Sequence, residues 1–194
     1  LLLTSKSYCE KIVLEKLVEL DSPWGSSFIN NNEIIVTEKS GKIKIVDILT
    51  NQIQELDHQL DFVVHGQGGL LDIIHKDNIV WISYTEDRGN YKTSTSIARA
   101  ELNKKKLMFK NIFQANPPID SGYHFGSRLA IKDNYIYASA GERGQGMIAQ
   151  DASKHPGSII RVHLDGSIPN DNPKFEGKSD WLPEIYQQSW CQRR

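Results

Sequence analysis

Three segments of the chain repeat one pattern, and this repeat constrains the fold more than any other feature of the sequence. In each segment an apolar, β-branched run leads into a glycine-containing turn, and a second alternating run follows it. The segments are 33–47, 78–100 and 134–164. Their closing glycines, Gly41, Gly89 and Gly144, lie 48 and 55 positions apart. Runs rich in Ile, Val and Tyr, broken by Asn, Asp and Gly, predict antiparallel β-hairpins.

The length of this repeat is typical of β-propeller blades, which recur roughly every 40–50 residues and carry several strands each. The rival fold is a single β-sandwich, which has turn signals every ~8–12 residues and no long period. The similarity of the three hairpins favours the propeller. We therefore predict an all-β fold, a partial β-propeller of about three four-stranded antiparallel blades, with helix in less than about a tenth of the residues.

The two ends of the chain set the expected domain boundaries. Residues 1–12 are interpreted as a possible signal-peptide remnant or a lead-in to the first strand, and the spacing over Cys9–Leu20, which also suits a helix, is interpreted as a strand. The partial propeller spans 13–186, and 187–194 form an aberrant tail without strand alternation. Three blades do not close a ring, because single-chain propellers have typically about four to eight. We therefore expect either assembly with further copies or the front part of a longer protein.

The composition excludes several classes of partner. A chain of 194 residues with 39% hydrophobic content can bury a core and ordinarily forms one domain. Twenty-three basic and 24 acidic residues give a formal charge of −1 without a basic stripe, which argues against nucleic acid. No apolar run approaches the ~20 residues that cross a bilayer, so we expect no membrane insertion. Cys9 and Cys191 are interpreted as two unrelated thiols.

The candidate catalytic residue is His124, in the glycine-bracketed turn 121–129. If the following stretch runs out and back along a sheet, His124 and Glu142 return to the same edge and open, with Gln67, into one cleft. A carboxylate beside an imidazole orients the ring, fixes its tautomer and raises its basicity, as a general base requires. These residues indicate a cofactor-dependent enzyme. The alternatives are a structural turn histidine at His124 and a merely flexible turn around Gln67.

A set of motifs spaced along most of the chain is more specific than any single turn. The motifs are Ser22–Gly25, Thr37–Lys42, Gly66–Asp72, Gly122–Leu129, Gly141–Gly144, Gln150–Asp151, Gly157–Arg161 and Leu164–Pro173. Over roughly residues 13–186 the chain resembles the N-terminal half of the soluble pyrroloquinoline-quinone (PQQ)-dependent sugar dehydrogenases. This glucose/sorbosone dehydrogenase family has a six-bladed propeller fold.

The resemblance implies an oxidoreductase that converts an aldose to a lactone by base-assisted hydride transfer. It assigns His124 as the catalytic base and a PQQ contact, and Gln67 as a second PQQ contact. It assigns Glu142 as the acidic partner at the sugar end of the site, with a catalytic and a substrate-binding role. Tyr123, beside the base, is a candidate for substrate binding, and packing of its ring on the sheet is an equal alternative.

The resemblance also implies PQQ and calcium as cofactors, an aldose and an external electron acceptor as partners, and a periplasmic or secreted location. After Tyr186 the family continues with a Gly-His-Arg-Asn-Pro-Gln-like stretch, which this chain lacks, and with the blades that bind calcium. We therefore expect no metal ligands in this chain and no sugar turnover by it alone. The alternatives are an inactive propeller fragment and a carbohydrate- or protein-binding propeller module. A propeller lactonase or esterase ranks lower, because the repeats show no acidic ring.

Overall fold

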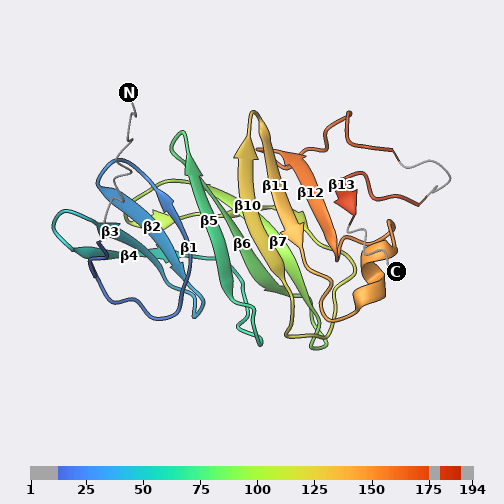
Figure 1. The fold of residues 1–194 in the computed structure, drawn as a ribbon, viewed down its shortest axis with the longest axis horizontal. Helices are drawn as coiled ribbons and strands as arrows, with labels where there is room; N and C mark the ends of the chain where they lie inside the picture. Colours follow the sequence, from blue (N-terminus) through green and yellow to red (C-terminus); the bar gives the residue numbers. More distant parts are fainter. Residues whose placement is uncertain (1–12, 175–179, 189–194) are drawn as a thin grey trace, which may run out of the picture.

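The computed structural model describes residues 13–174 and 180–188, which form three successive β-sheets (Figure 1). The first sheet contains β1 (Pro23–Phe28), β2 (Glu33–Glu38), β3 (Ile43–Asp47), β4 (Ile53–His58) and β8 (Lys106–Leu107). The second contains β5 (Leu70–Lys76), β6 (Ile79–Asp87), β7 (Thr93–Glu101) and β9 (Lys110–Gln114). The third contains β10 (Gly126–Lys132), β11 (Tyr135–Ala140), β12 (Ser158–His163) and β13 (Ile185–Gln188), and the 3-10 helix η1 (Gly146–Gln150) lies in the β11–β12 connection.

The arrangement of the sheets confirms the partial propeller and excludes the β-sandwich. Within each sheet the first four strands are antiparallel, and β8 adds a short parallel pair to the outer edge of β4. The first strands of successive sheets pack against each other, β1 on β5 and β5 on β10. Each sheet is therefore one blade, and Figure 1 shows the blades following one another from the blue to the red end of the chain.

The middle blade packs both of its faces against neighbouring blades, and each end blade packs one face against the middle blade. Along β6, Val80 and Ile82 pack in the core shared with the first blade, whereas Trp81 between them packs in the core shared with the third. The third blade alternates instead, because Ile136, Ala138 and Ala140 are buried while Tyr137 between them is half-buried. Period-2 alternation is what a sheet with one covered face requires. The apolar run in the second repeat and the alternation in the third both follow from this packing.

Each blade has an irregular register at the same place in its innermost strand. A hydroxyl from the second strand accepts a hydrogen bond from the backbone N–H at this place. The residues at these bulges are Gly25, Asp72 and Arg128. Their N–H groups donate, at 3.0 Å each, to the hydroxyls of Thr37, Ser83 and Ser139 respectively. Thr37 also donates to the Leu71 carbonyl of the second blade, and Ser83 donates to the Ser127 carbonyl of the third. A bulge leaves an N–H unpaired, so one hydroxyl both satisfies the bulge and joins two blades.

Replacement of Ser83 with alanine is expected to lower the free energy of unfolding by about 2 kcal/mol, because it leaves two buried backbone groups unpaired. Ser139→Ala is the matched control. It removes one hydrogen bond, to the exposed N–H of Arg128, and is expected to cost less than about 0.5 kcal/mol. Urea unfolding curves measure both values, and equal midpoints for the two variants would contradict the bridging role of Ser83.

The structure differs from two of the expectations about the chain ends. Residues 13–20 form no strand, and the expected strand over Cys9–Leu20 is wrong for these residues, because side chains such as Leu14, which is 93% exposed, lie against no partner strand. Gln187 and Gln188, the first two residues assigned to the tail, belong to β13 instead. They pair with Ile159 and Ser158 of β12. Residues 1–12 and 189–194 lie outside the described residues. In the described part of the chain, no helix is long and apolar enough to cross a membrane.

Candidate active site

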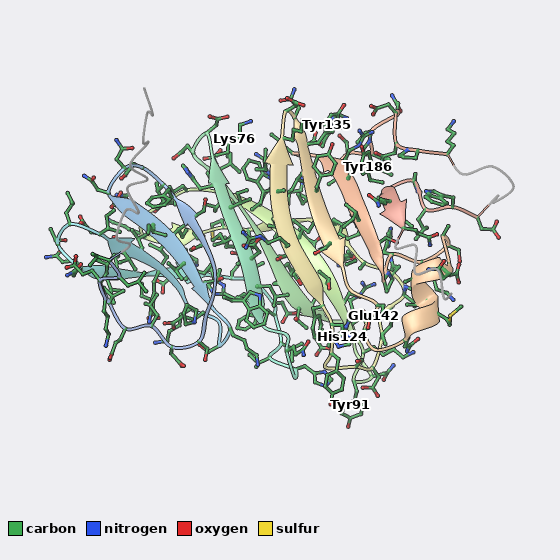
Figure 2. All side chains as sticks on the ribbon, viewed as in Figure 1. Lys76, Tyr91, His124, Tyr135, Glu142 and Tyr186 are labelled. Atoms are coloured by element: carbon green, nitrogen blue, oxygen red, sulfur yellow. The ribbon has the colours of Figure 1, made fainter. Side chains whose placement is uncertain are left out.

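The three polar candidates lie on turns at one end of neighbouring blades. Gln67 precedes β5, His124 precedes β10, and Glu142 follows β11, so the antiparallel strand order brings all three to the same end. Figure 2 shows His124 and Glu142 next to each other at this end, with Tyr91 beyond them and Lys76 at the opposite end. We call this end of the blades, which carries Gln67, His124 and Glu142, the catalytic pole.

His124 is held by contacts to both neighbouring turns. Its backbone N–H donates to Oε1 of Gln67 at 2.9 Å, and its ring Nδ1 hydrogen-bonds Oε1 of Glu142. A carboxylate only accepts hydrogen bonds, so this network assigns the proton of the neutral ring to Nδ1. The lone pair of Nε2 is then available to accept a proton. The side chain of His124 is 54% exposed, so a ligand can reach it.

Glu142 is held in its ionised form. Burial alone would raise the pKa of Glu142, but hydrogen bonds from His124 and from the backbone N–H groups of Glu142 and Gly144 outweigh it, and the pKa falls below its ordinary value of 4.5. Glu142 is therefore a carboxylate at neutral pH. A carboxylate that accepts from Nδ1 is the orienting partner that a histidine base needs.

Glycines allow the Gln67 and His124 turns to touch. The N–H of Gln67 donates to the carbonyl of Gly122 at 2.7 Å. A Cβ on Gly66, whose φ is +58°, would lie 2.3 Å from the same carbonyl. Only a glycine fits there, because both the contact and the backbone conformation exclude a side chain. Gln67 and His124 thus belong to one rigid pair of turns.

Tyr123 does not pack on the sheet. Its side chain is 63% exposed, and its ring stands edge-on to the His124 ring at 6.2 Å between centroids. Of the two alternatives for Tyr123, this position agrees with lining the site. Substrate binding by Tyr123 stays a prediction, as do the catalytic and cofactor-binding roles of His124, Glu142 and Gln67.

A cavity of about 510 Å³ adjoins the pole on the outer face of the third blade. Glu142 lines it together with residues of η1, β12 and β13, among them Ser158 and Gln188. His124 and Gln67 are not part of its lining, so the expected single cleft holds only one of the three side chains. The difference arises because His124 and Gln67 lie where the second and third blades meet, whereas Glu142 lies at the third blade's uncovered face.

One residue of this region, Arg143, has no role assigned to it from the sequence. Its side chain is 3% exposed and donates to backbone carbonyls of Ser121 and Tyr123 in the His124 turn. Its position in the motif Gly141–Gly144, directly after Glu142, was the only signal in the sequence. Among the described residues, no group of three or more His, Cys, Asp and Glu side chains is placed to hold a metal ion.

Comparisons with known proteins agree on one family. The family model described as Glucose / Sorbosone dehydrogenase matches residues 20–189. The aldose sugar dehydrogenase YliI of Escherichia coli K12 is 31% identical over 178 residues, which are 87% of this chain and 48% of that protein. Quinoprotein glucose dehydrogenase B of Acinetobacter calcoaceticus is 25% identical and covers 89% of this chain and 43% of its own length.

Solved structures give the same result. The apo form of the soluble aldose sugar dehydrogenase from Escherichia coli superimposes with a TM-score of 0.79 at 31% identity, over 86% of this chain and 50% of that one. The PQQ-bound form of an aldose sugar dehydrogenase from Streptomyces coelicolor superimposes with a TM-score of 0.75 at 25% identity, over 90% and 52%. The chain therefore spans about half the length of the curated relatives it matches.

Proposed function

This chain belongs to the glucose/sorbosone dehydrogenase family, and we propose that its catalytic pole carries the general base of a PQQ-dependent aldose dehydrogenase. The single observation that carries the proposal is the hydrogen bond between His124 Nδ1 and Glu142, which leaves the ring Nε2 free at an exposed position. The expected reaction is the two-electron oxidation of an aldose to its lactone. A periplasmic or secreted location, implied by the resemblance, is part of the proposal.

The role of the chain's own residues is to bind the sugar and move one proton. When the aldose is oxidised, its anomeric carbon loses a hydride and its anomeric hydroxyl loses a proton. Nε2 of His124 accepts that proton, and Glu142 stabilises the imidazolium ion that forms. When bound, PQQ supplies the two-electron acceptor for this oxidation. We expect Glu142 and the exposed ring of Tyr123 to contact the sugar.

The donors on the Gln67 turn suit one edge of a carboxylated quinone. Oε1 of Gln67 accepts from the His124 N–H, which leaves the amide NH₂ as a donor directed elsewhere. Nζ of Lys39 donates to the carbonyl of Gly66 and so places a cation beside the same turn. An amide donor and a lysine cation are groups that bind quinone oxygens and carboxylates. Gln67 and Lys39 are therefore the residues we expect to hold the cofactor.

A second candidate function is sugar binding without oxidation. Two exposed tyrosines lie near the catalytic pole. Tyr123 is 63% exposed and its ring adjoins that of His124, and Tyr91 is 86% exposed and lies beyond His124 in Figure 2. Exposed aromatic rings give sugars a flat apolar surface to stack on. A protein of this kind would bind an aldose and reduce no electron acceptor, so an oxidation assay separates the two functions.

The proposed cofactor contact is tested by titrating PQQ, with calcium present, into the chain and following tryptophan fluorescence. Gln67→Glu keeps the oxygen that accepts from His124 and replaces the NH₂ donor with a negative oxygen. We expect it to weaken PQQ binding by at least about tenfold, because a charge-assisted donor is lost and a repulsive charge is added. Gln52→Glu makes the same charge change on an exposed side chain of the first blade, outside the pole. Equal affinities for the two variants would contradict the contact at Gln67.

A further inference from the structure

We propose that Arg143 is a positioning residue for the base, and that its guanidinium holds the turn of His124 so that the ring faces Glu142. This inference rests on the proposed function of His124. Within the described residues no hydrogen bond or ring contact joins the Arg143 side chain to the His124 ring, so its action passes through the backbone and through neighbouring side chains.

The contacts of the Arg143 side chain with the turn fall on every second residue. Its Nε donates to the Tyr123 carbonyl at 2.9 Å, and its Nη2 donates to the Ser121 carbonyl. Its Cζ lies 3.6 Å from the centre of the Phe125 ring, a cation–π contact. The turn is thus gripped at residues 121, 123 and 125. The side chain of His124 takes no part in this grip and is 54% exposed.

The other end of the guanidinium is anchored in the second blade. Nη1 donates to the Thr93 carbonyl at 3.0 Å, and Nη2 donates to the Thr93 hydroxyl at 2.8 Å. Thr93 is itself buried and forms the start of β7. Arg143 therefore ties the His124 turn to a rigid strand end. A lysine at this position would keep the charge but has one nitrogen, which cannot serve four acceptors on three residues.

The acceptors of Arg143 are all neutral, which is unusual for a buried cation. The four acceptors are three backbone carbonyls and one hydroxyl. Burial lowers the pKa of Arg143 to about 10. A buried charge without a carboxylate partner is costly, and residues kept despite such a cost concentrate at functional sites. The geometry points to the same function, because the fork of donors closes on the turn of the base.

The two turns also share backbone contacts that transmit this grip to the His124–Glu142 pair. His124 and Arg143 both have positive φ, 48° and 57°, a conformation that non-glycine residues seldom adopt without support. The Arg143 N–H approaches the His124 carbonyl at 3.4 Å. Because Glu142 directly precedes Arg143, the residue that grips the turn also fixes the backbone of the carboxylate. A shift of Arg143 would displace both partners of the hydrogen bond.

The test determines the ring tautomer of His124 by ¹⁵N NMR, at a pH at which the imidazole ring is neutral. In the parent chain we expect the Nδ1–H form, held by Glu142. In Arg143→Lys and Arg143→Met we expect a mixture of both tautomers, while the amide spectrum stays that of the folded chain. Arg99→Lys, on the far end of the second blade, is the matched control and keeps the parental tautomer. Folded Arg143 variants that keep the Nδ1–H form would overturn the proposal.

A milder variant covers the case in which the Arg143 variants do not fold. Thr93→Val keeps Arg143 and removes one hydroxyl acceptor. We expect the amide protons of 123–125 to exchange about fivefold faster, as the loss of one net hydrogen bond predicts. Unchanged exchange would overturn the anchoring role. Neither measurement needs PQQ or sugar, so an inactive protein with the ordered tautomer would contradict the proposed function and leave this inference standing.

Discussion

Replacement of His124 with alanine is expected to lower kcat for aldose oxidation by about 100- to 10,000-fold, the range that a positioned general base contributes. The reason is that Nε2 of His124 is the group proposed to take the proton of the anomeric hydroxyl. The loss should appear equally in kcat and kcat/KM, because the interaction is made in the transition state rather than in the bound substrate. Dye reduction with an aldose, PQQ and calcium measures both parameters.

The assay is best made in a chimera, because the chain spans 48% of the Escherichia coli relative YliI. Residues 20–189, the part that the family model matches, replace the corresponding segment of that enzyme. His75→Ala is the matched control, since His75 lies in β5 outside the pole. A folded chimera without dye reduction would contradict the proposed function. An active chimera in which His124→Ala retains activity within about threefold would place the base elsewhere.

The fold was predictable where local pattern and packing coincide. The hairpins followed from β-branched runs bounded by turn residues, because β11 buries every second residue and β6 buries a continuous run between two neighbouring blades. The meeting of His124 and Glu142 followed from one out-and-back excursion, which antiparallel pairing of β10 with β11 fixes. Both features depend on strands of one blade that follow each other along the chain, so a single repeat contains the information.

Features that depend on contacts between repeats were not predictable. Arg143 acts on Thr93, 50 residues away, and no local pattern shows that a charged residue in a glycine turn will be buried in the neighbouring blade. The pairing of β8 with β4 is likewise set by how the second repeat packs on the first. The strand predicted over residues 13–20 is absent, because the apolar pattern of these residues has no partner strand to pair with. Tertiary context decides such cases.

The substitution with the largest expected effect on the architecture of the pole is Gly141→Ala. A Cβ on Gly141 would lie 1.9 Å from the His124 carbonyl oxygen, 2.6 Å from its carbon and 2.9 Å from the Gly126 nitrogen. All three atoms are backbone atoms, so no rotation of a side chain relieves the overlap. The two turns must move apart, and the expected cost in the free energy of unfolding is about 3 kcal/mol, at the upper end for overpacking.

This separation should also break the hydrogen bond between His124 and Glu142, because the clash lies between the turns that carry them. Gly146→Ala is the matched control, since it adds the same methyl group five residues away, where no atom lies within 4 Å. We expect urea unfolding to show the full loss for Gly141→Ala and less than about 0.5 kcal/mol for Gly146→Ala. The His124 ring of Gly141→Ala should also lose its Nδ1–H tautomer. Parental stability in Gly141→Ala would mean that the turns are not in the contact on which the proposed site depends.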